Sequence, residues 1–367
     1  MDDQLLDTDI IPGASKASMI SIVIPVFNGE DVIASTLESV VNQEVAAHEV
    51  FVVNDCSTDN TTKVCAAYPV TNIVLETNGG PAKARNVGVR QATGDIILFI
   101  DAGVVLRDPD TLKRLAKEFD DNPGVAGVVM IRDQDPLNDG LTPRYWAAIG
   151  YYQWMQPAKY HTSFATERSA IRRSVIENMD LFDEQYAAAD VEDHEFGHRL
   201  NELGHKILIA RELVTKDRFD TFKLSIPKML MRSYMWMQLF LKGKTFDSVW
   251  NTKDRAYKTL FGALSLGFLG LSVLGFFTFP TVLKVCACIS ALTAFIFLYY
   301  AGGFYTWLVK NGKVHLVVQF FILDILYSFI IALSASWSML IYHSDRIFGP
   351  SNGKSSPVSQ TDIDKMS

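Results

Sequence analysis

The sequence lacks several features that would assign it to a common class at once. Its first residues include Asp2, Asp3, Asp7 and Asp9 and have neither the basic start nor the apolar core of a signal peptide. We therefore expect an acidic tail over 1–17 and a first domain that stays in the cytosol. The net charge of −7 gives no sign of nucleic-acid binding. The four cysteines form no metal-ligand pattern, which favours free thiols in a reducing compartment.

Apolar residues are distributed unevenly along the 367 residues, which are enough for two or three domains. The mean hydropathy of +0.13 is high for a soluble protein. Residues 18–215 have the pattern of an ordinary α/β chain, 216–257 are basic and aromatic, and 258–343 are overwhelmingly apolar. The polar tail 344–367 is expected to be disordered. The chain therefore predicts a soluble domain followed by a membrane domain.

Strands alternate with helices in the α/β part. Apolar and β-branched runs predict buried strands at 19–27, 50–53, 72–75, 96–100 and 125–131. Helices are expected after Glu30, after Pro81 and from Asp108. This alternation predicts a parallel, doubly wound sheet.

The stretch Gly94–Gly103 carries the first functional indication. Its apolar run ends at Asp101, just before a glycine turn. In open α/β sheets, ligands bind beyond the carboxyl ends of the strands. A carboxylate there suits a ribose hydroxyl or a divalent metal that holds a diphosphate. Taken alone, Asp101 could equally well cap the turn.

Four further motifs accompany this stretch. They are IPVFN at 24–28, NDCSTD at 54–59, NGG with ARNVG between 78 and 88, and FDE at 182–184 followed by EDHEFGHRL at 192–200. In this order and spacing, residues 19–215 closely resemble the family 2 glycosyltransferases of the GT-A fold. The resemblance implies a Rossmann-like catalytic domain with a mainly parallel sheet. The apolar runs after it predict a C-terminal α-helical membrane domain.

The resemblance also implies how the donor would be bound. Pro25 and Phe27 would line the nucleoside pocket, and Asp55 would accept hydrogen bonds from the base. Arg85 would lie near the base or the diphosphate. Asp101 would face the ribose and the metal-bound diphosphate, and would thus be a metal ligand. The donor would be a UDP-, GDP- or dTDP-sugar.

By the same resemblance, Asp193 would be the catalytic base. Sugar transfer is a single displacement that inverts the anomeric carbon, and a carboxylate takes the proton of the attacking hydroxyl. A divalent cation, Mg or Mn, or cationic side chains must stabilise the leaving nucleotide diphosphate. A solvated acidic helix face with Glu192 and Glu195 is the alternative for Asp193. The apolar Phe196 and Leu200 favour the site.

Two positions depart from the family pattern. At the second strand, Asn54-Asp55-Cys56 replaces two aspartates and a glycine, but the more important Asp55 is retained. Gly103 replaces the second carboxylate of the Asp-x-Asp metal motif.

The replacement at Gly103 changes how a cation would be held. Asp101, water and the diphosphate would hold it more weakly, or another ligand would substitute. His161 and His194 qualify by residue type alone.

Residues 216–257 mix cations with aromatic and apolar side chains, which fits helices in the headgroup region. Nucleic-acid binding is the competing interpretation, disfavoured by the apolar block that follows. The segment lacks the Gln-x-x-Arg-Trp motif of processive polysaccharide synthases, since Arg232 and Trp236 are spaced differently. This favours an enzyme that adds a single sugar.

Apolar runs at 260–279, 281–301 and 314–342 are long enough to span a bilayer. Lys310 and Lys313 favour the cytosolic side for the connection before the last run, the side expected for the catalytic domain. The last run fits either one tilted span or a kinked hairpin.

Asp324 lies roughly 15 Å deep in the last run, by helical rise. A carboxylate at this depth is costly unless it faces a cavity or a partner. It would mark contact with a lipid-linked acceptor or partner helix, or be satisfied locally by Ser328 or Tyr327, or be protonated.

The sequence thus predicts an integral membrane glycosyltransferase that acts on a hydroxyl of a lipid-linked saccharide or envelope glycan. A polyprenyl-phosphate sugar synthase is the alternative. Its phosphate acceptor is already ionised and needs no base, so Asp193 favours the hydroxyl. From another class, the chain could be an inactive GT-A scaffold that binds a nucleotide sugar. Gly103 supports this alternative, and the presence of Asp193 argues against it.

Overall fold

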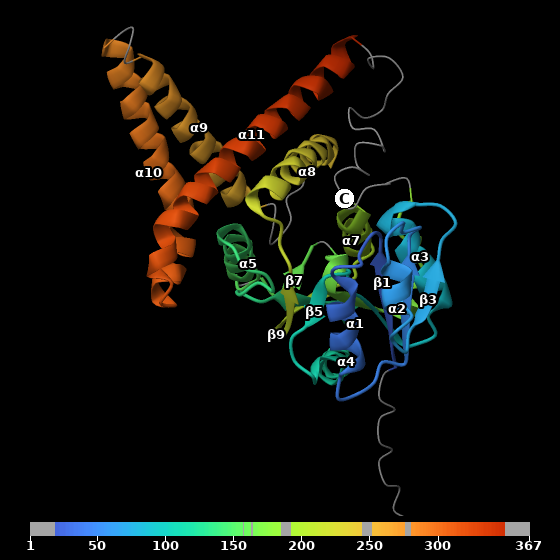
Figure 1. The fold of residues 1–367 in the computed structure, drawn as a ribbon. Helices are drawn as coiled ribbons and strands as arrows, with labels where there is room; N and C mark the ends of the chain where they lie inside the picture. Colours follow the sequence, from blue (N-terminus) through green and yellow to red (C-terminus); the bar gives the residue numbers. More distant parts are fainter. Residues whose placement is uncertain are drawn as a thin grey trace, which may run out of the picture.

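The computed structural model describes residues 19–156, 158–162, 164–184, 192–243, 252–275 and 280–348. The tail expected over 1–17 lies outside these ranges, as does most of the tail expected over 344–367. Figure 1 shows a domain built on a sheet, with long helices of the C-terminal part beside it.

Nine strands of the described chain form one sheet (Figure 1). The strands are β1 (Ile20–Val26), β2 (Glu49–Asn54), β3 (Thr71–Val74), β4 (Ile96–Phe99), β5 (Val104–Leu106), β6 (Gly127–Arg132), β7 (Tyr160–His161), β8 (Ser169–Arg172) and β9 (Ile207–Asp217). Their order is β3-β2-β1-β4-β8-β6-β9-β5, and β7 pairs with β9. The β3-β2-β1-β4 half is parallel, as the alternation of strands and helices predicts.

The other half of the sheet is mixed. β8 runs antiparallel between β4 and β6, and β5 and β7 run antiparallel to β9. Two reversals of direction leave β6 parallel to β4, so these two strands end at the same edge. β9 runs parallel to β6, with a shift of register after Met130. The antiparallel pairs were not expected from the sequence.

Helices cover both faces of the sheet. They are α1 (Ile33–Val41), α2 (Thr61–Cys65), α3 (Gly80–Gln91), α4 (Thr111–Asp121), α5 (Leu141–Trp154), α6 (Arg173–Ile176) and α7 (Glu192–Glu202). One apolar cluster packs α1, α2 and α4 on one face, and another packs α3, α6, α7 and the end of α5 on the opposite face. Ile22 of β1 belongs to the first cluster and Val23 to the second, as the two-residue period of a strand requires.

Four long helices follow the sheet domain. They are α8 (Phe222–Gly243), α9 (Lys253–Gly275), α10 (Pro280–Lys310) and α11 (Val317–Phe348). The ranges 253–273, 283–310 and 314–344 are long and apolar enough to cross a membrane, in agreement with the three apolar runs of the sequence. α11 is one unbroken helix, so of the two alternatives for the last run the structure has the single helix and not the kinked hairpin.

α5 of the sheet domain and α8 both pack against the apolar helices that follow. A third apolar cluster joins α5 to α10 and α11, and Tyr145 of α5 packs its ring on Phe320 and Tyr327 of α11. α8 lies along α11, whose Ser334 and Ser338 donate hydrogen bonds to backbone carbonyls of α8. The sheet domain is therefore fixed directly against the apolar helices.

Candidate active site

The predicted donor-site residues gather at the carboxyl edge of the parallel half of the sheet. β2, β1 and β4 are neighbours and end at this edge. Asp55 directly follows β2, Phe27 directly follows β1, and Asp101 closes the stretch that begins with β4. Pro25 is buried within β1, whereas Phe27 is partly exposed. This is the edge at which open α/β sheets bind ligands.

Asp55 fixes the start of α3. Its carboxylate oxygens accept hydrogen bonds from the backbone N–H of Gly79 at 2.9 Å and of Gly80 at 2.7 Å. Burial raises the pKa of Asp55, and these two bonds oppose the rise. The Asp55 carboxylate has lone pairs left that can accept a hydrogen bond from a base. That contact stays a prediction.

The turn after β2 explains why the family pattern has glycine at position 56. Cys56 has φ +66°, in the left-handed region that favours glycine. Asn54 holds the turn from inside: its amide donates to Thr62 at 2.9 Å and its oxygen accepts from the N–H of Ser57 at 2.8 Å. Asn54 thus shapes the loop that presents Asp55.

Arg85 of α3 is the centre of the site. Its guanidinium is 2% exposed and donates to Asp101 at 2.8 Å and to Glu192 at 2.7 Å. Burial would lower the pKa of Arg85, but the two carboxylates outweigh it and raise the pKa. Partial burial raises the pKa of Asp101 against the opposing charge of Arg85, and the charges of Glu167 and Glu192 raise it further. Arg85 therefore connects the donor-site carboxylate to the first turn of α7.

Asp193 follows Glu192 in that first turn. Its side chain is 17% exposed, and its Oδ1 accepts a hydrogen bond from the N–H of His194 at 2.7 Å. Asp193 thus lies at the amino end of α7, where a helix stabilises a negative charge. The structure brings Arg85, Asp101 and Glu192 into contact, and Asp193 is the residue that follows Glu192.

Asn86 connects two motifs that are distant in sequence. Its side chain accepts from the N–H of Phe182 and donates to the carbonyl of Phe182 and to Glu184. The ring of Phe182 packs on Phe99 and Phe196. The sequence contains the motif around Asn86 and the motif around Phe182, but only the structure shows that Asn86 joins them. In the same way, only the structure shows that Glu192 pairs with Arg85.

Because Gly103 has no carboxylate, Asp101 is the acidic residue that remains of the Asp-x-Asp motif. The φ of Gly103 is +95°, a conformation that an aspartate adopts only with strain, and its N–H donates to Thr36 at 2.9 Å. Within the described residues, no group of three or more His, Cys, Asp or Glu could hold a metal. Asp101 is still 39% exposed. One carboxylate with a substrate diphosphate is a common way to hold Mg²⁺, so the residues fit a cation that arrives with the donor.

The two histidines considered as substitute ligands have other surroundings. His161 is 1% exposed in β7, and its ring lies 4.9 Å from that of Trp154. The ring of His194 lies 4.0 Å from that of Trp236 on α8. In the described part of the chain, neither belongs to a group that could hold a metal.

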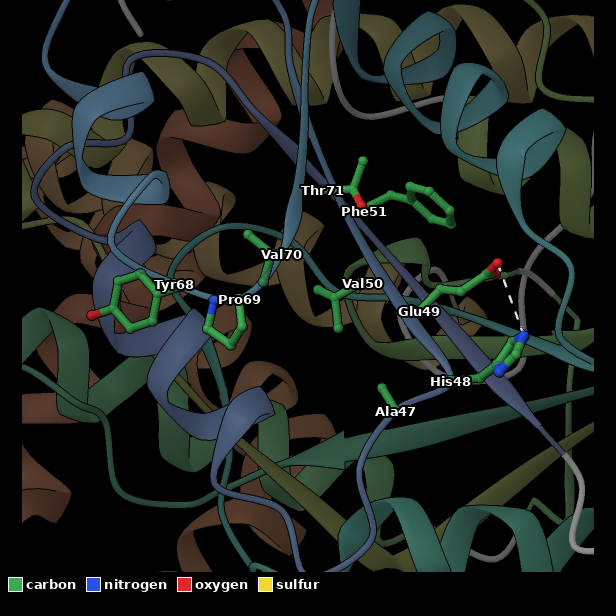
Figure 2. Close-up of a pocket in the computed structure, with 9 residues that line it drawn as sticks. All are labelled: Ala47, His48, Glu49, Val50, Phe51, Tyr68, Pro69, Val70 and Thr71. Carbon is green, nitrogen blue, oxygen red and sulfur yellow. Dashed lines mark ion pairs between the residues drawn. The ribbon is translucent and has the colours of Figure 1, made fainter.

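A surface pocket far from this edge is not the donor site. It is lined by residues 47–51 and 68–71, at the amino ends of β2 and β3 (Figure 2). The view shows Glu49 and His48 as an ion pair beside it. Ligands of open α/β sheets bind at the opposite ends of the strands, so this pocket has no part in the site.

Comparisons with known proteins find one family that matches part of the chain. Residues 21–179 match the family described as glycosyl transferase family 2. This stretch is similar to the family 2 glycosyltransferases. An uncharacterised glycosyltransferase of Haemophilus influenzae is 32% identical over 125 residues, which cover 34% of this chain and 42% of that protein. The succinoglycan biosynthesis protein ExoO of Rhizobium meliloti is 38% identical over 112 residues, 30% of this chain and 32% of ExoO. The chain thus spans less than half the length of these curated relatives.

A solved structure confirms the fold of the glycosyltransferase domain. The mannosyltransferase PcManGT from Pyrobaculum calidifontis, solved in complex with GDP-Man and Mn²⁺, is 17% identical. The comparison covers 90% of each chain with a TM-score of 0.53. The chain has the GT-A fold expected from its motifs.

Proposed function

We propose that this protein is a membrane-anchored, inverting glycosyltransferase. It moves a sugar from a nucleotide-sugar donor to a hydroxyl of a lipid-linked saccharide or a cell-envelope glycan. The observation that carries the proposal is the position of Arg85, which contacts both Asp101 and Glu192. It sets the donor-side carboxylate beside the helix turn that presents Asp193.

The donor lies across the carboxyl ends of β1, β2 and β4. Pro25 and Phe27 line the nucleoside pocket, and Asp55 accepts from the base. A UDP-, GDP- or dTDP-sugar fits this assignment. PcManGT, which shares the fold, was solved with GDP-Man, and ExoO is named for the synthesis of a polysaccharide. PcManGT supports a nucleotide sugar as the donor, and ExoO supports a glycan as the product.

Asp193 takes the proton of the acceptor hydroxyl as its oxygen attacks the anomeric carbon. The bond to the nucleotide diphosphate breaks on the opposite side, so the configuration inverts. Asp101 would hold the cation that accompanies the donor diphosphate, with Glu167 nearby. A divalent cation, Mg or Mn, would neutralise the charge that develops on the leaving diphosphate. Mn²⁺ in PcManGT supports this assignment.

The apolar helices anchor the enzyme, and the catalytic domain lies on the cytosolic side. Lys313, in the connection between α10 and α11, pairs with Asp135 of the sheet domain at 3.1 Å. That connection therefore lies on the same side as the active site. The positive residues at this connection favour the cytosol, where nucleotide sugars are made available to the enzyme.

The first test is a panel of nucleotide sugars with the full chain in detergent and a membrane lipid extract. Release of nucleotide diphosphate that depends on acceptor is expected for one donor. Asp193→Asn is expected to lower kcat by at least about 100-fold, because proton transfer by a positioned base contributes this much. Glu202→Gln, on the exposed end of α7, is the matched control and should keep full activity.

Two outcomes would contradict the proposal. If no donor is consumed under any condition, the chain is a nucleotide-sugar-binding scaffold and not an enzyme. If bare polyprenyl phosphate accepts the sugar equally well in Asp193→Asn and in the unchanged protein, the acceptor is a phosphate and the protein is a polyprenyl-phosphate sugar synthase.

A further inference from the structure

A second carboxylate, that of Glu167, lies opposite Asp101. β4 and β8 run antiparallel, with Leu98 opposite Ala170. The same register, carried three residues further, sets Asp101 opposite Glu167 in the turn just before β8. The N–H of Asp101 donates to the carbonyl of Glu167 at 3.3 Å, so the pairing continues to this point. Directly opposed residues of an antiparallel pair have Cβ atoms about 4.5–5.5 Å apart, on the same face of the sheet.

That face is the one that α3 covers. In β4, Phe99 packs in the apolar cluster of this face, and Asp101 follows one strand period later. In β8, Ile171 packs in the same cluster, two strand periods after Glu167. Arg85 of α3 reaches Asp101 from this face. Glu167 and Asp101 are therefore neighbours on the donor side of the sheet.

Each of the two carboxylates has one oxygen bound by arginine. Oδ1 of Asp101 accepts from Arg85 at 2.8 Å. Oε1 of Glu167 accepts from Arg132 at 3.3 Å and from Arg168 at 3.4 Å. In the part of the chain that the structure describes, no other residue donates to Oδ2 of Asp101 or to Oε2 of Glu167. The two side chains are 39% and 23% exposed, so a ligand from solvent can reach both.

The arginines that bind Glu167 are themselves fixed. Arg168 is 1% exposed and pairs with Asp217 through two hydrogen bonds, at 2.7 and 2.9 Å. Arg132 lies against Gly150 of α5, where an added Cβ would clash with the arginine Cδ. Both arginines therefore hold the Glu167 carboxylate in one direction. A ligand that is held in advance loses less side-chain entropy when it binds.

Two neighbouring carboxylates, each with an oxygen left over, suit a divalent cation. Mg²⁺ and Mn²⁺ take oxygen ligands, and carboxylates are common among them. The two negative charges repel each other, and a cation between them removes that repulsion. The turn at Gly103 cannot supply this second carboxylate, because its residue has no side chain.

We propose that Glu167 is the second carboxylate ligand of the cation, in place of the aspartate that Gly103 lacks. Asp101 would contribute Oδ2 and Glu167 would contribute Oε2. This proposal rests on the function proposed above, because the diphosphate of the donor and water would complete the set of ligands. The second ligand thus comes from the strand next to β4, and not from the Asp-x-Asp motif itself.

The binding of nucleotide and Mn²⁺ tests this without any turnover. The full chain in detergent is titrated calorimetrically with UDP, GDP and dTDP, each with Mn²⁺ and with EDTA. Mn²⁺ is expected to tighten the binding of at least one nucleotide. Glu167→Gln is expected to reduce this tightening at least about tenfold, because losing even a partner of a metal ligand costs 10–100-fold in metal affinity. Asp101→Asn should act in the same way.

Glu177→Gln is the matched control. Glu177 also pairs with an arginine, Arg173, but at the other edge of the sheet, since β8 ends beside the start of β4. This variant should keep the full effect of Mn²⁺. Electron paramagnetic resonance of Mn²⁺ in the same samples measures the bound fraction directly, and it should fall in Glu167→Gln alone of these two variants.

Binding in EDTA separates a ligand from a structural role. Glu167→Gln removes a negative charge beside the diphosphate, so nucleotide affinity without a cation should stay the same or rise. A displaced turn would instead lower the affinity by the same factor with and without Mn²⁺, and this result would overturn the proposal. Glu167→Asp keeps the charge but draws the oxygens back by one methylene, so it tests the site if Glu167→Gln does not fold. Its Mn²⁺ effect should fall too.

Two further outcomes would overturn the proposal. An unchanged Mn²⁺ effect in the Glu167 variants would remove Glu167 from the ligands. The absence of any Mn²⁺ effect with all three nucleotides in the unchanged protein would remove the cation site itself. An Mn²⁺ effect that depends on Glu167, in a protein that transfers no sugar, would keep this site and reject the proposed activity, so the two failures are distinguishable.

Discussion

At the scale of single residues, Cys56 stands where the family pattern has glycine, and its backbone conformation lowers the stability of the fold. A residue with a Cβ in the left-handed region costs about 1–2 kcal/mol, while glycine in a turn loses about 0.5–1 kcal/mol more chain entropy on folding. Cys56→Gly is therefore expected to raise the free energy of unfolding by roughly 0.5–1 kcal/mol. Thermal unfolding of the full chain in detergent measures this. Cys56→Ala keeps the strain and should give no gain. An equal gain in both variants would show that the thiol, and not the backbone, is responsible.

The second prediction at the residue scale concerns the carboxylate of Glu167. Burial would raise its pKa, but Arg168 and Arg132 lower the pKa to about 2, from an ordinary value of 4.5. A depressed pKa stabilises the folded state above pH 4.5, and this contribution is lost as the pH falls toward 2. Glu167→Gln is thus expected to cost on the order of 2–3 kcal/mol at pH 7.

The pH series supplies the control for Glu167. The difference in unfolding free energy between Glu167→Gln and the unchanged protein should shrink as the pH is lowered from 5 to 3. Glu177→Gln, which breaks an exposed pair with Arg173, should cost less than about 1 kcal/mol at any pH. A difference for Glu167→Gln that stays constant with pH would mean that the carboxylate charge is not what stabilises this cluster.

At the scale of elements, two kinds could be predicted from the sequence: helices with one buried face, and strands that form long apolar runs. β1, β2, β4 and β6 are such strands, whereas β5, β7 and β8 have two to four residues and leave no periodic pattern. α5 was not predicted for a different reason. Trp154 packs against the sheet and Tyr145 against α11, so the helix has apolar residues all round and no polar face to reveal its period.

The candidate site follows the same division. The strand-end motifs predicted Asp55, Arg85 and Asp101 because the carboxyl ends of parallel strands share an edge. Glu167 could not be predicted, since it lies in the 3-10 turn Thr166–Arg168, which has no distinctive pattern. Arg132 ends a strand, but only the fold shows that it pairs with Glu167 and Asp217. The roles of these residues in sugar transfer stay predictions until variants are measured.

At the scale of the whole molecule, Asp324 connects the sheet domain to the long apolar helices. Its carboxylate, 3% exposed, accepts hydrogen bonds from Tyr145 of α5 at 2.8 Å and Tyr305 of α10 at 3.0 Å, and pairs with Lys258 of α9 at 2.6 Å. The sequence pointed to Ser328 or Tyr327 as local partners, but the hydroxyl of Tyr327 bonds to Ser225 instead. The actual partners are 19 to 179 residues away, too far for any local pattern to indicate.

This arrangement predicts how the two parts of the molecule depend on each other. Asp324→Leu removes the carboxylate and leaves the buried Lys258 without it, so the variant is expected to lose about 3–5 kcal/mol of stability. Removing both charges in Lys258→Met/Asp324→Leu should recover most of that loss, because the buried ammonium is gone as well. Thermal unfolding of the full chain in detergent, followed at the catalytic domain and at the helices, measures both. Asp95→Leu, a carboxylate outside this junction, controls for the substitution itself.

If the double variant is no more stable than Asp324→Leu, the carboxylate acts through its two tyrosines and not through Lys258. Tyr145→Phe then separates the cases, since losing one hydrogen bond to a charged group should cost roughly 1.5–3 kcal/mol.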